Sequence, residues 1–241
     1  MAPPTDLNRL HHRSMADAVA SSLRRMILTG ELAPGRRVTQ DELAKMLGVS
    51  TMPIREALLR LVAEGLISAA ANRSFSVVST TLDDIRDIFW THSVLAGELT
   101  RRACERSTDE LIEVLRDARE DYLEALAAGQ QERMQEANWR FHKAINSAAA
   151  APKLLLVLRT TLRFFPDFRD DVPGWPELAG RWHRHVLDAF LQGRPDEARK
   201  AAEDHVREAG EILVAHARSL GLWSDAEADA GTGAAAGSAP R

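Results

Sequence analysis

Three histidines and an asparagine occupy positions from which they could bind a metal ion together. Asn138 and His142 lie four residues apart on an apolar helical stripe, so both side chains project from one face of the helix predicted at 130–149. His183 and His205 join the apolar stripes of two later helices in the same way. Three packed helices would therefore direct imidazole nitrogens and an amide oxygen into one core.

This cluster has two interpretations. A single histidine on an apolar stripe is commonly a core residue whose ring nitrogen finds a hydrogen-bond partner. Several buried polar rings cost roughly 1 to 3 kcal/mol each when unpartnered, and one shared ion would satisfy them together. Three imidazoles and an oxygen suit Zn²⁺, with Ni²⁺ or another first-row ion as an alternative. Because all four donors are neutral, the ion would keep its charge and favour an anionic ligand, such as the carboxylate of a small metabolite.

Three further residues are candidates for contact with such a metabolite. His92 lies on the apolar stripe of the helix predicted at 82–107, where it is either a core histidine or an effector contact. Arg159 and Arg163, four residues apart on the helix predicted at 152–165, could bind an acid, although exposed arginines are common on helices. A metal-dependent hydrolase is the enzyme alternative, but no H-E-x-x-H motif, nucleophile elbow or phosphate-binding loop is present. We therefore do not expect an enzyme.

The elements that carry these residues make up a helical C-terminal region. No alternating strand pattern appears there, and each helical segment opens or closes at Pro, Gly, Ser or Thr. Six or seven such helices predict an antiparallel all-α bundle, whose core is the usual place for a ligand or metal. The predicted segments are 82–107, 108–128, 130–149, 152–165, 176–192 and 195–220.

The N-terminal region has a different pattern, which predicts a helix-turn-helix. Between Thr39 and Ile67, two short amphipathic helices meet at Gly48, a residue that can adopt the left-handed conformation favoured at helix ends. Thr39 and Glu42 fit a capping box on the first helix, and Ser50 is placed to cap the second. A further helix precedes the pair and a short hairpin follows it, which predicts a winged helix-turn-helix.

The expected DNA contacts lie mainly on the second helix of this motif and on the tip of the hairpin. Packing of the Ile54 and Leu58 side of the helix leaves Arg55 on another face, where it can enter a major groove. The expected contacts are Arg36, Ser50, Thr51, Arg55, Arg73 and Ser74.

Charge divides the chain at the same place as the helical pattern. Residues 1–79 contain 10 Lys and Arg against 7 Asp and Glu, a net charge of +3, and the remainder contains 21 against 28, a net charge of −7. A local positive charge is sufficient for phosphate attraction, because screening limits that attraction to roughly 8 to 10 Å. The imbalance is small, so the helix-turn-helix pattern carries the prediction of DNA binding.

Composition sets the remaining expectations. The single cysteine, and the lack of a signal peptide or an apolar stretch of membrane-spanning length, favour a cytoplasmic protein without a membrane partner. The expected domains are a flexible segment at 1–13, a DNA-binding domain at 14–79, an all-α effector-binding and dimerisation domain at 82–222, and a disordered tail at 224–241.

The N-terminal region resembles the GntR family of bacterial transcription regulators. The resemblance lies in LRRMILTGELAPGRRV (23–38), LAKMLGVS (43–50) and PIREALLRL (53–61). It implies a homodimeric winged-helix repressor that binds double-stranded DNA at an inverted repeat. The family usually has an arginine where this chain has Thr51, so one basic contact with DNA is absent. A glycine is common where Ser74 stands.

Most of the C-terminal region is similar to the FCD effector domain of the FadR branch of this family. The family's Asp-x3-His motif maps onto Asn138 and His142, and two later histidines map onto His183 and His205. The resemblance implies a bound divalent metal and an acidic effector, with a neutral amide in place of the carboxylate ligand. The related domains often have an arginine at the position of His92. A DNA-binding dimer with neither metal nor effector is the alternative.

Overall fold

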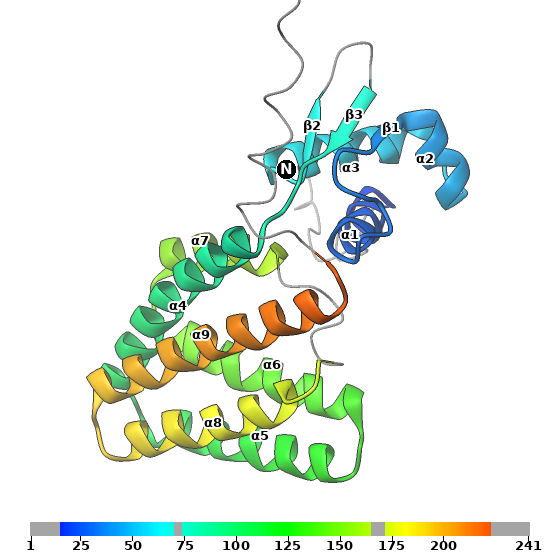
Figure 1. Ribbon diagram of the computed structural model, residues 1–241. Coiled ribbons are helices and arrows are strands. Elements are labelled where there is room, and N and C mark those ends of the chain that lie inside the picture. Colours follow the sequence, from blue (N-terminus) through cyan, green and yellow to red (C-terminus); the bar gives the residue numbers. More distant parts are fainter. Residues whose placement is uncertain (1–14, 70–73, 165–171, 223–241) are drawn as a thin grey trace, which may run out of the picture. The chain divides into compact units, whose positions relative to one another are not determined.

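The computed structural model describes residues 15–69, 74–164 and 172–222, and the chain divides into two compact units. The first unit takes in the chain up to Thr81 and the residues from Gly221 on, and the second covers Leu82–Leu220 (Figure 1). The segments expected to be flexible or disordered, 1–13 and 224–241, lie outside the described residues. Within the described ranges, no helix is long and apolar enough to cross a lipid bilayer.

The first unit combines three helices with a small antiparallel sheet. Its elements are α1 (Met15–Leu28), β1 (Arg37–Thr39), α2 (Gln40–Leu47), α3 (Thr51–Ala63), β2 (Ile67–Ala69) and β3 (Ser74–Val77). β2 and β3 form the predicted hairpin, with Ser68 opposite Ser76. The sequence pattern does not predict β1, which pairs with the other side of β3 and places Val38 opposite Phe75.

Two residues set the geometry of the helix-turn-helix, which is formed by α2 and α3. Thr39 caps α2, because its hydroxyl accepts a hydrogen bond from the backbone N–H of Glu42 at 3.2 Å. Gly48 ends α2 with a φ of 67°, a conformation that strains other residues. Glu42 does not close the expected capping box, because its carboxylate instead binds the Arg36 guanidinium at 2.6 Å. Ser50 occupies the N-cap of α3 but makes no side-chain capping bond.

A buried apolar face and one ion pair hold α3 against α1. Ile54 and Leu58 of α3 are completely buried, and Leu23 of α1 is 1% exposed. Just after α3, the carboxylate of Glu64 accepts hydrogen bonds from Nε and Nη2 of Arg24 at 2.8 to 3.0 Å. These contacts fix the buried side of α3 and leave its other side to solvent.

The second unit is an all-α bundle, as predicted. Its helices are α4 (Leu82–Glu105), α5 (Asp109–Ala127), α6 (Gln131–Ala148), α7 (Pro152–Thr161), α8 (Trp175–Leu191) and α9 (Pro195–Ser219). Thr108 caps α5 through its hydroxyl, and prolines stand in the first turns of α7, α8 and α9, where they leave no hydrogen bond unmade. α7 ends before the predicted residue 165, and a short 3-10 helix covers Leu162–Phe164.

Two glycines allow α4 and α9 to pack closely side by side (Figure 1). A Cβ atom at Gly97 of α4 would lie 2.6 Å from Cγ of Glu203 in α9. A Cβ atom at Gly210 of α9 would lie 2.8 Å from Cβ and Cγ of Phe89 in α4. Neither distance is compatible with a side chain, so both helices depend on glycine at these crossing points.

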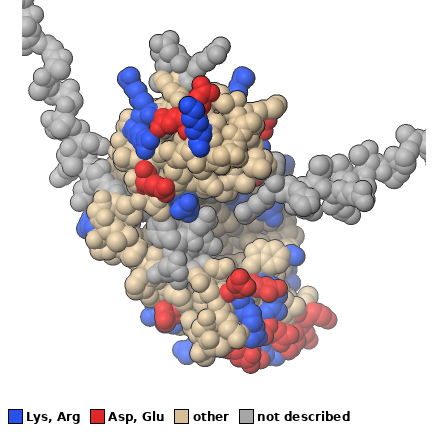
Figure 2. Space-filling model, turned by 90° about the vertical axis from the view of Figure 1, so that its right-hand side faces the viewer, with Lys and Arg blue, Asp and Glu red and all other residues tan. Residues whose placement is uncertain are grey.

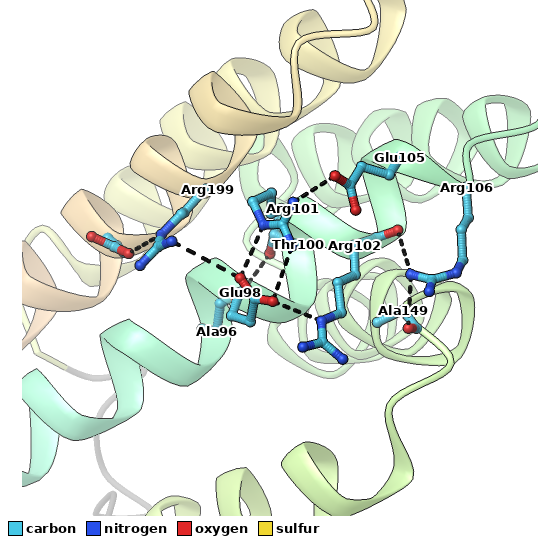
Figure 3. A network of polar contacts seen from close by, with 10 residues as sticks. Ala96, Glu98, Thr100, Arg101, Arg102, Glu105, Arg106, Ala149 and Arg199 are labelled. Atoms are coloured by element: carbon cyan, nitrogen blue, oxygen red, sulfur yellow. Dashed lines mark hydrogen bonds and ion pairs between the residues drawn. The ribbon is translucent and has the colours of Figure 1, made fainter.

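Ion pairs join the same two helices at their outer edge, as Figure 3 shows. Glu98 of α4 binds Arg101 and Arg102 of its own helix and lies 3.9 Å from Arg199 of α9. Hydrogen bonds from Arg101 and Arg102 lower the pKa of Glu98 to about 2. The carboxylate therefore stays ionised and holds these arginines in place.

Candidate functional site

The outward side of α3 carries residues expected to contact DNA. Thr51 and Arg55 are exposed, whereas Ile54 and Leu58 of the same helix are completely buried. The first turn of α3 also has backbone N–H groups without helical acceptors, which can bind a phosphate. An exposed helix with a basic side chain near its N-terminus has the arrangement that reading of a major groove requires.

The other expected DNA contacts have different surroundings. Ser50 is exposed at the start of α3. Arg36 is paired with Glu42 at 2.6 Å, so its charge is partly neutralised. Ser74 is half-buried at the start of β3, and Arg73 lies outside the described residues. Of the expected DNA contacts that the structure describes, the exposed ones are therefore Ser50, Thr51 and Arg55, at the start of α3.

The arginines of α3 differ in whether a carboxylate neutralises them. Arg60 of α3 forms an ion pair with Asp17 of α1, whereas Arg55 is exposed on the same helix. Figure 2 shows Lys and Arg side chains interspersed with Asp and Glu on the face in view, without a broad surface of one sign. The placement of individual arginines on α3 is therefore more informative than the net charge of the unit.

The bundle brings the predicted histidines together around the indole of Trp182. His142 of α6 and His205 of α9 both stack on this indole, with ring centroids 4.8 and 4.7 Å away. His183, which follows Trp182 on α8, is completely buried, and its ring centroid lies 6.3 Å from that of His142. Helices that are distant in sequence thus supply one histidine cluster, comprising His142, His183, His205 and Trp182.

Asn138 of α6 joins this histidine cluster through His183. Nε2 of His183 lies 3.1 Å from Oδ1 of Asn138. Phe141 stacks on the His183 ring at 4.2 Å and Tyr122 packs edge-on against it at 4.8 Å, so the ring is held in place. Two ligands that bind one Zn²⁺ at about 2.1 Å are themselves about 3.0 to 3.4 Å apart. The two atoms form a hydrogen bond in this structure, and their distance is also that of adjacent metal ligands.

Three ring nitrogens of the histidine cluster are buried and have no hydrogen-bond partner among the described residues. They are Nδ1 of His183, Nδ1 of His205 and Nε1 of Trp182. Most buried polar atoms in proteins are partnered, and leaving one without a partner costs about 1 to 3 kcal/mol. The indole N–H of Trp182 is a donor and needs a hydrogen-bond acceptor, whereas an imidazole nitrogen can bind a polar ligand or, through its lone pair, a metal ion.

The histidine cluster is not assembled as a complete metal site in this conformation. Among the described residues, no three His, Cys, Asp or Glu side chains converge in a way that could hold a metal ion. The 6.3 Å between the rings of His142 and His183 exceeds the roughly 5 Å expected for neighbouring imidazoles on one ion. The spacing of Asn138 and His183 fits a shared ion, whereas His142 and His205 would have to move closer.

Burial holds two of the cluster imidazoles, those of His183 and His205, in their neutral form. Desolvation is the main cause, and it lowers the pKa of His205 to about 3 and the pKa of His183 well below its ordinary value of 6.5. Repulsion from a charge on His142 acts in the same direction at both positions, and Arg119 also lowers the pKa of His183. A neutral imidazole is the form that binds a metal ion.

His92 of α4, the first of the expected effector contacts, is also buried and neutral. Burial lowers its pKa to about 3, with a further contribution from His142. Thr161 donates its hydroxyl proton to the carbonyl of Leu158 at 2.7 Å, so it accepts a hydrogen bond from Nδ1–H of His92 at 2.6 Å.

Of the two arginines expected to contact an effector, only Arg159 has a described side chain, and it does not face the bundle interior. Arg159 is exposed on α7, because the inward face of this helix is formed by Leu158 and its apolar neighbours. The side chain of Arg163 lies outside the described residues.

Sequence reasoning missed the contribution of α5 to the site. Tyr122 contacts His183, and Arg119, one turn earlier, acts electrostatically on the same imidazole. The available signal was the buried stripe of Leu115, Ala118 and Tyr122, which places Arg119 beside the inward face of the helix.

Family models match both units. Residues 15–77 match the family described as "Bacterial regulatory proteins, gntR family", and residues 87–208 match the FCD domain. Each match lies within one of the two compact units.

Relatives and solved structures agree with these matches. The Nta operon transcriptional regulator of Aminobacter aminovorans is 28% identical over 189 residues, which are 76% of this chain and 86% of that protein. The HTH-type transcriptional regulator McbR of Escherichia coli is 32% identical over 149 residues, 61% of this chain and 66% of that protein. The solved structure of E. coli McbR/YncC covers 85% of this chain and 99% of its own, with a TM-score of 0.60 and 23% identity. A GntR regulator from Rhodococcus covers 83% and 98%, with a TM-score of 0.54 and 21% identity.

At these identities the structural likeness shows a shared fold, and the family models add the function that goes with it. The relatives are transcription regulators and not enzymes. The chain belongs to the GntR family of bacterial regulators, in the branch with a C-terminal FCD domain, and it is a DNA-binding transcription regulator.

Proposed function

We propose that this regulator is a homodimeric repressor whose operator binding is modulated by a small carboxylate metabolite held at a divalent metal ion in the helical bundle. The observation that carries the proposal is the set of imidazoles that α6, α8 and α9 bring together, in which Nδ1 of His183 and Nδ1 of His205 are buried without a hydrogen-bond partner among the described residues. Such a cluster is costly for the bundle to maintain without a ligand.

The donor set suits a first-row metal ion, with Zn²⁺ the first choice and Ni²⁺ an alternative. Asn138 and His183 have the spacing of adjacent ligands, and His142 and His205 are the remaining donors. Asn138 is uncharged, and the lowered pKa values of His183 and His205 keep these two imidazoles neutral. An ion bound here would keep its double charge in a medium of low polarity, which favours an anionic metabolite as its further ligand.

The homodimer is supported by apolar residues that the bundle leaves exposed on α4 and α7. The exposed residues are Trp90 at 58%, Leu156 at 62%, Val157 at 51% and Leu162, just after α7, at 46%. Large apolar side chains gathered on neighbouring elements are typical of protein interfaces. Two-fold symmetry would then present two α3 helices to an inverted repeat of double-stranded DNA.

Zinc analysis and operator binding by the full-length protein test the metal-dependent part of this proposal. We expect the wild type to retain zinc after mild purification, and His183→Ala and His205→Ala to lose it, melt earlier and fail to respond to carboxylic acids. Basal DNA binding should survive in both variants. His185→Ala is the matched control, because His185 lies on the exposed side of α8. A wild type without zinc, whose response is unchanged by these substitutions, would exclude the metal.

Fluorescence anisotropy with labelled operator DNA tests the reading helix. Arg55→Ala should abolish specific binding and leave the fold intact, because the packed side of α3 is formed by Ile54 and Leu58. Arg60→Ala is the control, since it removes the same charge from the same helix at a residue paired with Asp17. Equal operator affinity of Arg55→Ala and wild type would refute the assignment.

One observation favours a second candidate, a DNA-binding dimer with neither metal nor effector. Among the described residues, no three suitable side chains converge on a metal position. In that case the imidazoles of the histidine cluster would serve only as packing residues around Trp182. Zinc content of the wild type separates the two candidates directly.

A further inference from the structure

Arg119 of α5 has a buried, unpartnered polar atom beside the histidine cluster. The residue as a whole is half-buried, and its Nε is inaccessible to solvent and has no hydrogen-bond partner among the described residues. An arginine side chain cannot lose its proton in a protein, so the charge has to be stabilised by an acceptor. A buried guanidinium N–H without an acceptor is therefore a position where an anionic group would be stabilising.

The position of Arg119 on α5 places it at the cluster. It lies three residues before Tyr122, and residues with this spacing are neighbours on one face of a helix. Tyr122 packs edge-on against His183, with ring centroids 4.8 Å apart, and donates its hydroxyl to the carbonyl of Pro176 at 2.8 Å. The charge of Arg119 is also among the causes that lower the pKa of His183.

Other arginines near this region are already neutralised by carboxylates. Arg116, one turn earlier on α5, pairs with Glu113. Arg181 of α8, which lowers the pKa of His205, pairs with Glu208 at 2.8 Å and is largely exposed. Arg119 differs from both, because its Nε has no partner among the described residues.

The cluster itself offers Arg119 no negative charge. The position at which the related domains carry an aspartate is the neutral Asn138, whose Oδ1 contacts Nε2 of His183. The imidazoles of His142, His183 and His205 supply no negative charge either, because an imidazole is neutral or cationic. A guanidinium next to neutral donors attracts an anion, and its planar fork matches the two oxygens of a carboxylate.

We infer that Arg119 is the residue that anchors the anionic group of the effector, donating from Nε and one terminal nitrogen to a carboxylate held beside His183. This inference rests on the proposed effector site. It replaces Arg159, which is exposed, as the arginine that would determine preference for an acid.

The test is calorimetric titration of the zinc-loaded, full-length protein with acetate, lactate, succinate and citrate. Arg119→Gln should weaken the tightest-binding acid more than tenfold and leave zinc content and the melting temperature of the acid-free protein close to wild type. Arg119→Lys should bind with intermediate affinity, because it keeps the charge but loses the fork. Arg116→Gln, the matched control on the same helix, should bind as wild type.

The possible outcomes separate this inference from the proposed function. If the wild type binds zinc and an acid, and both Arg119 variants bind that acid equally well, the inference is wrong and the effector site stands. If none of the acids binds to the wild type, the inference is overturned together with the proposed class of effector.

If the wild type carries no zinc, the titrations are made on the metal-free protein. A loss of acid binding confined to the Arg119 variants would then support the inference without the metal. If Arg119→Gln does not fold, the fold-change measured for Arg119→Lys against Arg116→Gln decides.

Discussion

The buried imidazole of His92 should make the helical bundle sensitive to acid. Its pKa falls from an ordinary 6.5 to about 3, mainly because burial disfavours the charged form. Above the unfolded value, the imidazole is neutral in both states and contributes no pH dependence. As the pH falls below 6.5, the unfolded chain takes up a proton that the folded chain does not, so the free energy of unfolding decreases.

The size of this effect follows from the difference in pKa. Between about pH 7.5 and about pH 5.5, one histidine that stays neutral in the fold removes about 1.4 kcal/mol from the free energy of unfolding. His92 is only 7% exposed, so solvent does little to reduce this amount. His183 and His205 act in the same direction, because burial depresses the pKa of each of them.

Urea unfolding of metal-free protein at the two pH values, followed by tryptophan fluorescence, measures this effect. Four of the five tryptophans, Trp90, Trp139, Trp175 and Trp182, belong to the second unit, so the transition reports mainly the bundle. His92→Asn keeps an N–H donor for Thr161 and should reduce the acid-induced loss by about 1.4 kcal/mol. His185→Asn, on the exposed side of α8, should leave it unchanged. An equal loss in wild type and His92→Asn would show that His92 is not held neutral by the fold.

Three further changes have defined consequences. Gly210→Ala should lower the free energy of unfolding of the bundle by about 1 to 3 kcal/mol in the same urea assay, because the added Cβ would lie 2.8 Å from Cβ of Phe89. A variant as stable as the wild type would contradict the close packing. Thr51→Arg should raise the affinity for DNA, and the salt dependence of that affinity, measured by anisotropy titration, should steepen by about one phosphate contact. An unaltered salt dependence would mean that residue 51 faces away from DNA. Asn138→Asp should raise zinc affinity about tenfold or more in a competition titration with a chelator, because a carboxylate is a stronger ligand than an amide. The same variant should bind carboxylic acids more weakly, and stronger acid binding would contradict the electrostatic argument.

Local sequence signals predicted most of the fold. Thr39 and Gly48 delimit the first helix of the DNA-binding motif, since a hydroxyl cap and a left-handed glycine act within one turn. Thr108 and the prolines at the starts of α7 and α9 did the same in the bundle. The local signals were wrong or silent where a residue outside the segment supplied a partner. Glu42 binds Arg36 instead of closing a capping box, and β1 forms by pairing with the edge of β3.

The sequence by itself also determined which face of each helix is buried, because apolar side chains at helical spacing place Asn138, His142, His183 and His205 toward the interior. It did not determine what those faces meet. That His142 and His205 stack on Trp182, that Arg119 lowers the pKa of His183 and that Arg159 is exposed depend on the relative positions of neighbouring helices. Those positions are set by contacts between residues far apart in the chain, such as the close approach of α4 and α9 at Gly97 and Gly210. The period of a single helix contains no information about such contacts, so only the tertiary structure decided the composition of the site.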